Sequence, residues 1–327
     1  MRFALNDVYP NIQKAAHELP IGTPASRIKF GMHLSKFKGR GPNFYQNVEY
    51  DPNEHDIDQI QWHLTDPDGK VYVREAIIDK DYQVVVMADL STSMMFGMRY
   101  PYKLRLLFET IGNIGLTCVH AQDPMGFIGF AGNIIFDERP RVGEGPVYYL
   151  LDEMYKFFYG LEQDGKGPLK REGTDFKKAF DFFSLRYAGK NPFLIVISDF
   201  VGMEEFVDTQ LLKDISSENE IVFLFLDDPD EFNVRSWLSR VFGITFGYLR
   251  IRNIETGKRS TVSIRKWRKM GKEIRQKRKV MRERLKDAGI DSMVLEYTEQ
   301  GKHFERLYRF FLGRRGLLKD RTKVIQQ

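Results

Sequence analysis

The chain has few of the residues that most often build zinc or disulfide sites. Its 327 residues contain one cysteine, Cys118, and six histidines that are scattered along the chain. Cys118 falls on the apolar side of a predicted helix, which indicates a buried, reduced thiol and is consistent with a cytoplasmic location. His55 and His63 have neither a companion cysteine nor a helical pairing, so we expect no zinc site.

Long apolar runs are also missing. The two longest, residues 193–197 and 221–226, are far shorter than the roughly 20 residues that a membrane-spanning helix needs. Residues 1–20 carry charged side chains and no apolar core segment, so no secretion signal is expected. Residues 39–44 look superficially like a phosphate loop, but no Lys-Ser or Lys-Thr pair follows and Pro42 disfavours a helix there.

Positive charge is concentrated in one segment. The formal net charge is +5, and residues 265–287 alone hold twelve Lys or Arg against three Asp or Glu. Apolar residues recur along one face of this segment, which predicts a basic amphipathic helix docked by that face. The expected apolar face consists of Trp267, Met270, Ile274, Met281 and Leu285.

One stretch, residues 83–95, organises the rest of the chain. Residues 84–88 are a short apolar run without a solvent face, which predicts a central strand of a parallel sheet. The strand ends in Asp89, and Ser91 and Ser93 follow at alternate positions. Because ligands of open α/β sheets lie beyond the carboxyl ends of the strands, these three side chains are candidate functional residues. One carboxylate and two hydroxyls form an oxygen-only group suited to a hard cation such as Mg²⁺.

Two later segments extend this pattern. Thr174 lies at the start of a predicted helix, and residues 193–198 are another buried strand that is followed by Asp199. Asp-x-Ser-x-Ser, then Thr, then Asp, each at the end of a strand or the start of a helix, is the pattern of the metal ion-dependent adhesion site of von Willebrand factor A domains. The chain resembles that family in these residues and in their order. The resemblance implies a Mg²⁺ site, which Mn²⁺ could also occupy, formed by Asp89, Ser91, Ser93, Thr174 and Asp199.

Strands that alternate with helices over residues 79–315 predict an α/β domain of the von Willebrand factor A-like type, with a doubly wound, mostly parallel sheet flanked by helices. Residues 228–288 are expected to leave this domain as a β-hairpin followed by the basic helix. Before the domain, residues 1–27 are predicted to be an irregular arm, because they hold three prolines, and residues 28–78 a small β-rich region. Residues 316–327 are expected to be a frayed tail.

A narrower resemblance is to the MoxR-associated branch of von Willebrand factor A-like bacterial proteins, and it covers roughly residues 30–315. It is carried by a Gly-rich segment, an element that ends in Trp, a Val-Arg-Glu strand and an Asp-x-Ser-x-Ser-Met motif. In this chain these features are Gly39-Arg-Gly41, Ile60-Gln61-Trp62, Tyr72-Val-Arg74-Glu75 and Asp89-Leu-Ser-Thr-Ser93-Met94. The chain departs from the family at Gln61, where the family has an acidic residue, and at Glu54-His55-Asp56, where it has Gly-Asp-Asp.

The resemblance implies a non-catalytic adaptor that binds other proteins through its metal. Ser91, Ser93 and Thr174 would supply direct ligands. Asp89 and Asp199 would act largely through waters or hydroxyl hydrogen bonds, which leaves one position for a partner's Asp or Glu. Such proteins are similar to adaptors that work with MoxR-type AAA+ ATPases in assembling or activating other proteins. The ATPase would supply the energy, since this sequence shows no nucleotide-binding motif.

Two other functions stay open as alternatives. A metal-dependent phosphatase of the haloacid dehalogenase type also has an Asp after its first strand, but it needs a second Asp two residues later as general acid. This chain has Ser91 there, and a serine hydroxyl has no useful proton affinity near neutral pH, so we do not expect an enzyme. The other alternative is contact with nucleic acid through the basic helix, although that helix has few aromatic side chains for base stacking.

Overall fold

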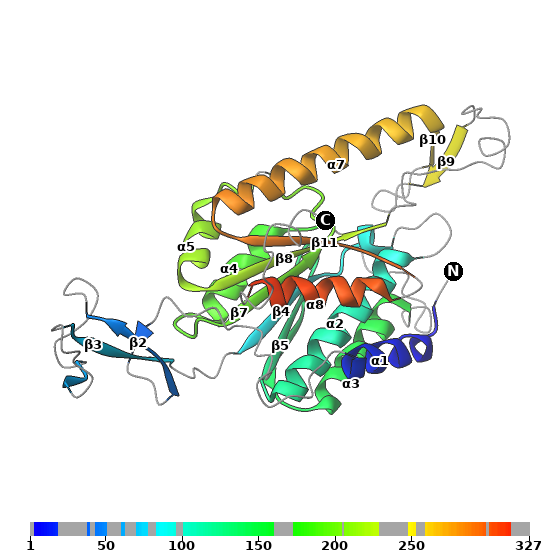
Figure 1. The fold of residues 1–327 in the computed structure, drawn as a ribbon. Helices are drawn as coiled ribbons and strands as arrows, with labels where there is room; N and C mark the ends of the chain where they lie inside the picture. Colours follow the sequence, from blue (N-terminus) through cyan, green and yellow to red (C-terminus); the bar gives the residue numbers. More distant parts are fainter. Residues whose placement is uncertain are drawn as a thin grey trace.

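The computed structural model describes residues 3–18, 38–39, 43–50, 60–62, 70–77, 83–95, 101–159, 173–204, 206–228, 248–252, 259–298 and 301–314. The tail predicted for residues 316–327 lies outside these residues. Figure 1 shows one large sheet with helices on both sides, a small sheet apart from it, and a two-stranded hairpin at the start of a long helix.

Six strands of the described chain pair into the large sheet: β4 (Val84–Asp89), β5 (Met125–Phe130), β6 (Ile134–Arg141), β7 (Phe193–Ser198), β8 (Glu220–Asp227) and β11 (Asp291–Glu296). Across the sheet their order is β11-β8-β7-β4-β5-β6. Neighbouring strands are parallel, except that β6 runs antiparallel to β5. The predicted doubly wound, mostly parallel α/β sheet is therefore confirmed.

The first strand of this sheet in sequence, β4, lies in its middle. The chain adds β5 and β6 on one side of β4, and then β7, β8 and β11 on the other. The strand order thus reverses between β4 and β7. In doubly wound sheets such a reversal opens a crevice at the carboxyl ends of the two strands, and ligands bind there.

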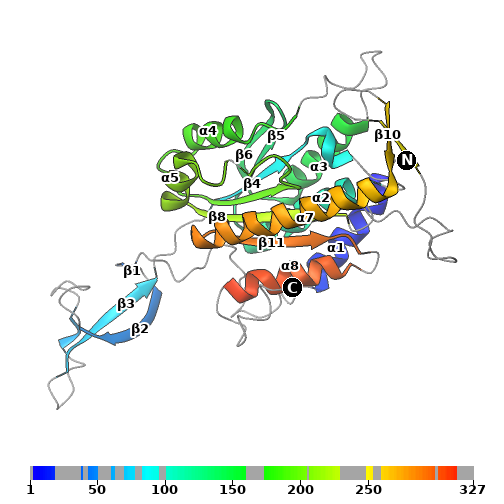
Figure 2. The same ribbon diagram turned by 90° about the horizontal axis from the view of Figure 1, so that it is seen from above.

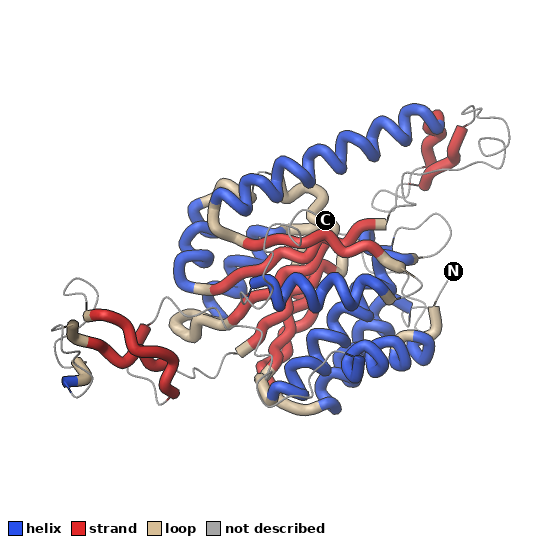
Figure 3. Tube along the Cα trace, in the orientation of Figure 1, coloured by secondary structure: helices blue, strands red, loops and turns tan. Residues whose placement is uncertain are grey.

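The helices of the described chain are α1 (Tyr9–Glu18), α2 (Tyr102–Ala121), α3 (Glu144–Tyr159), α4 (Phe176–Arg186), α5 (Gln210–Glu218), α7 (Ile264–Asp287) and α8 (Lys302–Arg314). Helices α1, α2, α3 and α8 pack on one face of the sheet, and α4, α5 and α7 on the other (Figure 2, Figure 3). Strand β4 contributes to both cores, because alternate residues such as Val86 and Met87 point to opposite faces. None of the described helices is both long enough and apolar enough to cross a membrane.

The N-terminal residues are not the irregular arm that we predicted. A short 3-10 helix, η1 (Leu5–Asp7), leads into α1, and Phe3 and Ile12 are buried in the core beside α2. Pro10 lies in the first turn of α1, where the missing N–H of proline costs no hydrogen bond. Gly112 of α2 lets the two helices approach closely, because a Cβ at this position would collide with the Ile12 side chain.

Two smaller sheets lie outside the large one. Strands β1 (Lys38–Gly39), β2 (Asn43–Glu49) and β3 (Tyr72–Ile77) pair antiparallel in the order β1-β3-β2, within the stretch predicted to be β-rich. Strands β9 (Tyr248–Arg252) and β10 (Arg259–Ser263) pair antiparallel and lead directly into α7. The predicted hairpin and the basic helix after it are confirmed.

The apolar face predicted for α7 is wrong at one position. Met270 is 38% exposed, because it lies beside the buried stripe of the helix rather than on it. The buried residues follow the alternating three- and four-residue spacing of a helix stripe. They are Ile264, Trp267, Gly271, Arg278, Met281 and Leu285. The stripe therefore contains a cation, Arg278.

Glu109 of α2 connects three helices in the interior. Its side chain has no exposed surface, and its Oε1 accepts hydrogen bonds from Asn11 Nδ2 of α1 and from Arg105 Nε, both at 3.0 Å. Nε2 of His303, on α8, lies 2.9 Å from the other oxygen, Oε2. Burial by itself would raise the pKa of Glu109, but the interactions with His303, Asn11 and Arg105 together hold that pKa below its ordinary value.

Glu109→Gln is expected to lower the free energy of unfolding by about 2 kcal/mol near neutral pH, because it weakens charge-assisted hydrogen bonds in the interior. A carboxyl group with a depressed pKa stabilises the fold above the pKa of the unfolded chain, and this contribution disappears as the pH falls through the folded value. Denaturant unfolding should thus show the variant and the wild type converging below about pH 4. Glu305→Gln, at an exposed site on α8 beside Arg309, should cost less than about 0.5 kcal/mol. A difference for Glu109→Gln that does not change with pH would contradict this role.

Candidate functional site

Asp89 lies at the carboxyl end of β4, where the strand order reverses. Its side chain is almost fully buried. The Ser91 N–H donates to Oδ1 at 2.8 Å, and Ser198 Oγ donates to Oδ2 at 2.7 Å. Thr174 Oγ1, from the loop before α4, lies 3.3 Å from Oδ2. Three separate segments of the chain therefore hold this carboxylate in one orientation.

The hydroxyls of Ser91 and Ser93 lie side by side. A turn of 3-10 helix, η4 (Thr92–Met95), begins directly after Ser91 and leaves the two Oγ atoms 2.9 Å apart. In an octahedral Mg²⁺ site with metal–oxygen distances of about 2.0–2.1 Å, adjacent ligands are also about 2.9 Å apart. The spacing of these hydroxyls fits two neighbouring positions around such an ion.

Asp199 directly follows β7, the neighbour of β4. Its Oδ1 accepts the Val201 N–H at 3.2 Å, and its Oδ2 accepts a hydrogen bond at 3.0 Å from Lys103 Nζ, a buried ammonium at the start of α2. The next residue, Phe200, has a φ of 53°, which is uncommon for a residue other than glycine. The buried Phe200 ring stacks on that of Phe176, at 5.9 Å between centroids, and this packing holds the turn that aims Asp199.

Arg278 joins helix α7 to the same end of the sheet. It is only 7% exposed, and its Nε donates to the backbone oxygen of Asp199 at 3.1 Å. Its Nη1 donates to Oδ1 of Asp227, the last residue of β8, at 2.6 Å. One guanidinium thus holds α7 against the carboxyl ends of β7 and β8.

The two carboxylates of the site have opposite pKa shifts. Burial and the charge of Asp199 raise the pKa of Asp89 to about 6, although hydrogen bonds from Ser198 and Ser91 act in the other direction. Burial would also raise the pKa of Asp199, but the charges of Lys103 and Arg278 hold it below its ordinary value. The shifts differ because Asp89 faces another carboxylate, whereas two cations act on Asp199.

The donors gathered here suit a hard divalent cation. Hydrogen bonds bring Asp89, Ser91, Ser93 and Thr174 together, and Asp199 is close enough for its charge to act on Asp89. All five side chains offer oxygen atoms, which Mg²⁺ and Mn²⁺ prefer. Over the residues that the structure describes, no cluster of three or more His, Cys, Asp or Glu could hold a metal ion. A cation bound at this site would therefore rely on hydroxyl ligands.

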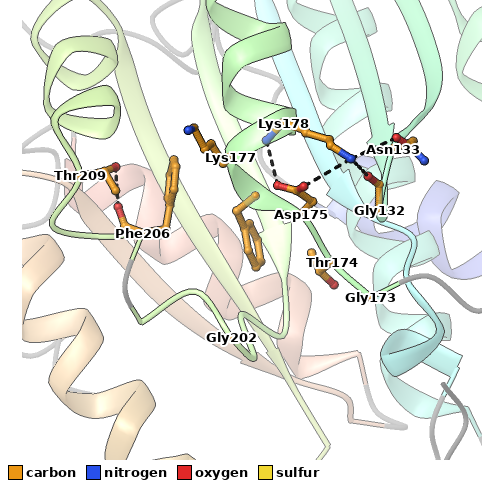
Figure 4. Close-up of a pocket in the computed structure, with 11 residues that line it drawn as sticks. Gly132, Asn133, Gly173, Thr174, Asp175, Lys177, Lys178, Gly202, Phe206 and Thr209 are labelled. Carbon is orange, nitrogen blue, oxygen red and sulfur yellow. Dashed lines mark hydrogen bonds and ion pairs between the residues drawn. The ribbon is translucent and has the colours of Figure 1, made fainter. Parts of the chain in front are cut away.

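An open groove of about 740 Å³ borders the site on the Thr174 side (Figure 4). Its walls are formed by Gly132 and Asn133 after β5, by the start of α4, and by Gly202, Phe206 and Thr209 after β7. The Thr174 side chain belongs to both the groove and the group around Asp89. The groove therefore adjoins the site through Thr174, whereas Asp89, Ser91, Ser93 and Asp199 are not among the residues that line it.

Three side chains of the site were not among the predicted site residues. Ser198 links Asp89 to the turn after β7, Lys103 pairs with Asp199, and Arg278 holds α7. The sequence contains a signal for the two cations. Lys103 lies one helical turn before the buried Leu107 in α2, and Arg278 lies in the buried stripe of α7. A buried cation requires a buried anion, but the periodicity of a helix does not say which one.

Comparisons with known proteins identify a family. No curated protein matches the chain. The crystal structure of a conserved hypothetical protein BatB from Bacteroides thetaiotaomicron is 16% identical, over 72% of this chain and 100% of that chain, with a TM-score of 0.37. A point mutant of the PilB minor pilin from Streptococcus sanguinis is 9% identical, over 76% of this chain and 66% of that chain, with a TM-score of 0.33. An uncharacterized membrane spanning protein from Vibrio fischeri is 14% identical, over 70% of this chain and 97% of that chain, with a TM-score of 0.21.

These structural similarities are too weak to assign a function. The family comparison is more extensive: the model described as "Protein of unknown function DUF58" matches residues 47–284, which is more than half of the chain. The chain therefore belongs to the DUF58 family.

Proposed function

We propose that the protein is a metal-dependent protein-binding module in which Mg²⁺ captures an acidic side chain of a partner. The residues proposed to hold the ion are Asp89, Ser91, Ser93, Thr174 and Asp199. The observation that carries this proposal is the convergence of a carboxylate and three hydroxyls at the point where the strand order reverses, with two hydroxyls 2.9 Å apart. The ion would supply positive charge and a coordination position for a carboxylate of the partner.

The partner proposed is an AAA+ ATPase of the MoxR type, in the cytoplasm, together with a client protein that the pair assembles or activates. This part of the proposal rests on the von Willebrand factor A-like pattern of the sequence and on its resemblance, over roughly residues 30–315, to MoxR-associated proteins. The ATPase would provide the energy, and this protein would provide the contact with the client.

The proposal also implies that the site binds a partner without catalysing a reaction. The residue two positions after Asp89 is Ser91, whose hydroxyl lies against Ser93 Oγ and cannot act as a general acid near neutral pH. Purified protein with Mg²⁺ or Mn²⁺ should consequently not hydrolyse generic phosphate esters or ATP. A turnover that survives repeated purification and vanishes in Asp89→Asn would favour the phosphatase alternative.

Thermal unfolding with and without metal tests the site directly. Mg²⁺ and Mn²⁺ are expected to raise the melting temperature of the wild type by mass action, because the donors converge only in the folded protein, and EDTA should reverse the shift. Ser91→Ala and Ser93→Ala should lose most of the shift. Ser184→Ala, at an exposed position of α4, is the matched control and should keep it. Equal shifts in all four proteins would remove these hydroxyls from the metal site.

A pull-down with the MoxR-type ATPase of the same organism tests the partner. Binding is expected with Mg²⁺ and should be lost with EDTA and in the Ser91→Ala variant. If EDTA and Ser91→Ala leave binding of the ATPase unchanged, the contact between the two proteins does not use the metal.

A further inference from the structure

We propose that the outer edge of strand β11 is a second docking site, which takes an acidic, extended segment of a partner protein as an added strand. Two features that lie side by side support this: a sheet edge without a neighbouring strand, and a row of cations on helix α7. Neither feature includes a residue of the proposed metal site, so this inference goes beyond the proposed function and can fail independently of it.

Strand β11 lies at one end of the large sheet. It pairs with β8 on one side, and no strand of the described chain pairs with its other side. Within residues 292–296, the backbone hydrogen bonds that the structure describes are the ladder to β8 and one from Arg282 Nη2 to the Ser292 oxygen, at 3.4 Å. Such an edge presents backbone N–H and C=O groups to which an extended segment can pair.

Helix α7 carries a continuous row of cations next to its buried stripe. The stripe follows an alternating three- and four-residue spacing, and every residue one position later is Lys or Arg. These residues, called the basic row here, are Arg265, Arg268, Lys272, Arg275, Lys279, Arg282 and Lys286. Because each residue turns a helix by about 100°, the row runs along one flank of α7. The acidic residues of the helix, Glu273, Glu283 and Asp287, lie outside the row.

Contacts on the two flanks of α7 show which way the basic row faces. Arg284, on the flank opposite to the row, pairs at 2.9 Å with Asp208, in the segment after β7. Arg282, in the row, donates from Nε to Ser292 Oγ of β11 at 3.3 Å. Since β7 lies further inside the sheet than β11, the basic row faces outward, past the edge strand (Figure 2).

The row and the strand also match in length. A turn over residues 288–290, in which Gly289 has a φ of 74°, reverses the chain, so β11 runs back along α7 (Figure 1). The part of the row from Arg275 to Lys286 is about 16 Å long at 1.5 Å per residue, and the six residues of β11 span about 16 Å at 3.3 Å per residue. Every second side chain of an added strand would therefore face the row.

The charge of this surface favours an acidic occupant. Lys279 and Lys286 are exposed and form no ion pair with any residue that the structure describes. The acidic residues of β11 stand at its two ends, Asp291 and Glu296, and Glu296 pairs with Arg306 of α8 at 3.7 Å. The middle of the strand therefore offers no anion to the row.

Two other occupants fit less well. The last residues of the chain, 315–327, hold four Lys or Arg and one Asp, so their charge has the same sign as that of the row. Nucleic acid would match the cations, but it cannot pair with the backbone of β11, and the row contains no aromatic side chain for base stacking. Lysines beside an edge can also serve only to prevent pairing with other sheets, in which case an acidic strand would not bind.

Binding of a fluorescent peptide to the full chain, followed by anisotropy, tests the proposal. The probe is a short peptide of alternating Glu and Thr, and a peptide of alternating Lys and Thr is the control for charge. The acidic peptide is expected to bind, more weakly as the salt concentration rises and equally well with EDTA. The basic peptide should not bind.

Charge reversal locates the binding surface. Lys279→Glu combined with Lys286→Glu should weaken binding of the acidic peptide about tenfold or more. Lys213→Glu combined with Lys266→Glu, at two exposed lysines outside the row, changes the net charge equally and should weaken binding less than about threefold. Equal effects of the two pairs would exclude the row as the binding surface.

Two measurements test the pairing of strands and need no variant. Binding of the acidic peptide should slow hydrogen exchange of the amides of β11, and methylation of every second backbone nitrogen of the peptide should weaken binding about tenfold or more. If the peptide does not bind, if it leaves the exchange of β11 unchanged, or if the methylated peptide binds equally well, strand addition is overturned. A single-stranded oligonucleotide of equal charge that binds more tightly than the peptide would replace it with a nucleic-acid contact.

Discussion

Asp89→Asn is expected to abolish binding of Mg²⁺ and Mn²⁺ while the fold is retained. Asp89 is the carboxylate around which Ser91, Ser198 and Thr174 are arranged, and asparagine keeps its shape without its charge. The loss of metal affinity should exceed the roughly 10–100-fold that removal of an outer hydrogen-bond partner costs at metal sites. Isothermal titration calorimetry measures it, and the same is expected for Asp89→Ala. An affinity that is unchanged in both variants would exclude Asp89 from the metal site.

The raised pKa of Asp89 adds a pH dependence to this prediction. Because the carboxylate must be ionised to hold a metal, metal affinity of the wild type should fall as the pH drops through about 6. A carboxyl group with a raised pKa stabilises the fold below the pKa of the unfolded chain, and this contribution is lost as the pH rises through the folded value. In the absence of metal, Asp89→Asn should accordingly be more stable relative to the wild type at pH 7 than at pH 4, as measured by urea unfolding.

Arg278→Leu is expected to lower the free energy of unfolding by about 3–4 kcal/mol, because it leaves the buried carboxylate of Asp227 without its cation. It also removes the hydrogen bond to the Asp199 backbone oxygen, so the turn that carries Asp199 should become less well fixed. Metal affinity is then expected to fall by about 10–100-fold, as for other outer partners of metal ligands. Chemical denaturation and calorimetry measure the two effects separately.

The neighbouring residue provides a matched control. Lys277 pairs with Glu204 at 3.3 Å, but both side chains are more than one third exposed, so Lys277→Met should cost less than about 1 kcal/mol. Combining Arg278→Leu with Asp227→Leu should recover part of the lost stability, because it also removes the buried unpaired charge. If Arg278→Leu is no more destabilising than Lys277→Met, the pair with Asp227 does not hold α7 in place.

Most of the sheet could be read from the sequence. Residues 84–88, 193–197 and 221–226 are continuous apolar runs, and such runs have few stable places other than the middle of a sheet covered on both faces. The N-terminal helix could not be recognised in this way. Its sequence is polar apart from a few positions, and Ile12 becomes a core residue only because Gly112 of α2 leaves room for it.

The candidate oxygen ligands were also readable from the chain, because Asp89, Ser91 and Ser93 are neighbours in sequence, and Thr174 and Asp199 lie at the ends of recognisable elements. The pairing of the two aspartates with cations could not be read from the sequence. Asp199 accepts hydrogen bonds from Lys103, which lies 96 residues earlier in the sequence, and from Arg278, which lies 79 residues later. Hydrophobic periodicity reports which face of a helix is buried, but only the structure shows that Lys103 and Arg278 are among the buried residues of their helices. Which anion each cation meets depends on the strand order, since β4, β7 and β8 bring Asp89, Asp199 and Asp227 to one edge only when the sheet is assembled.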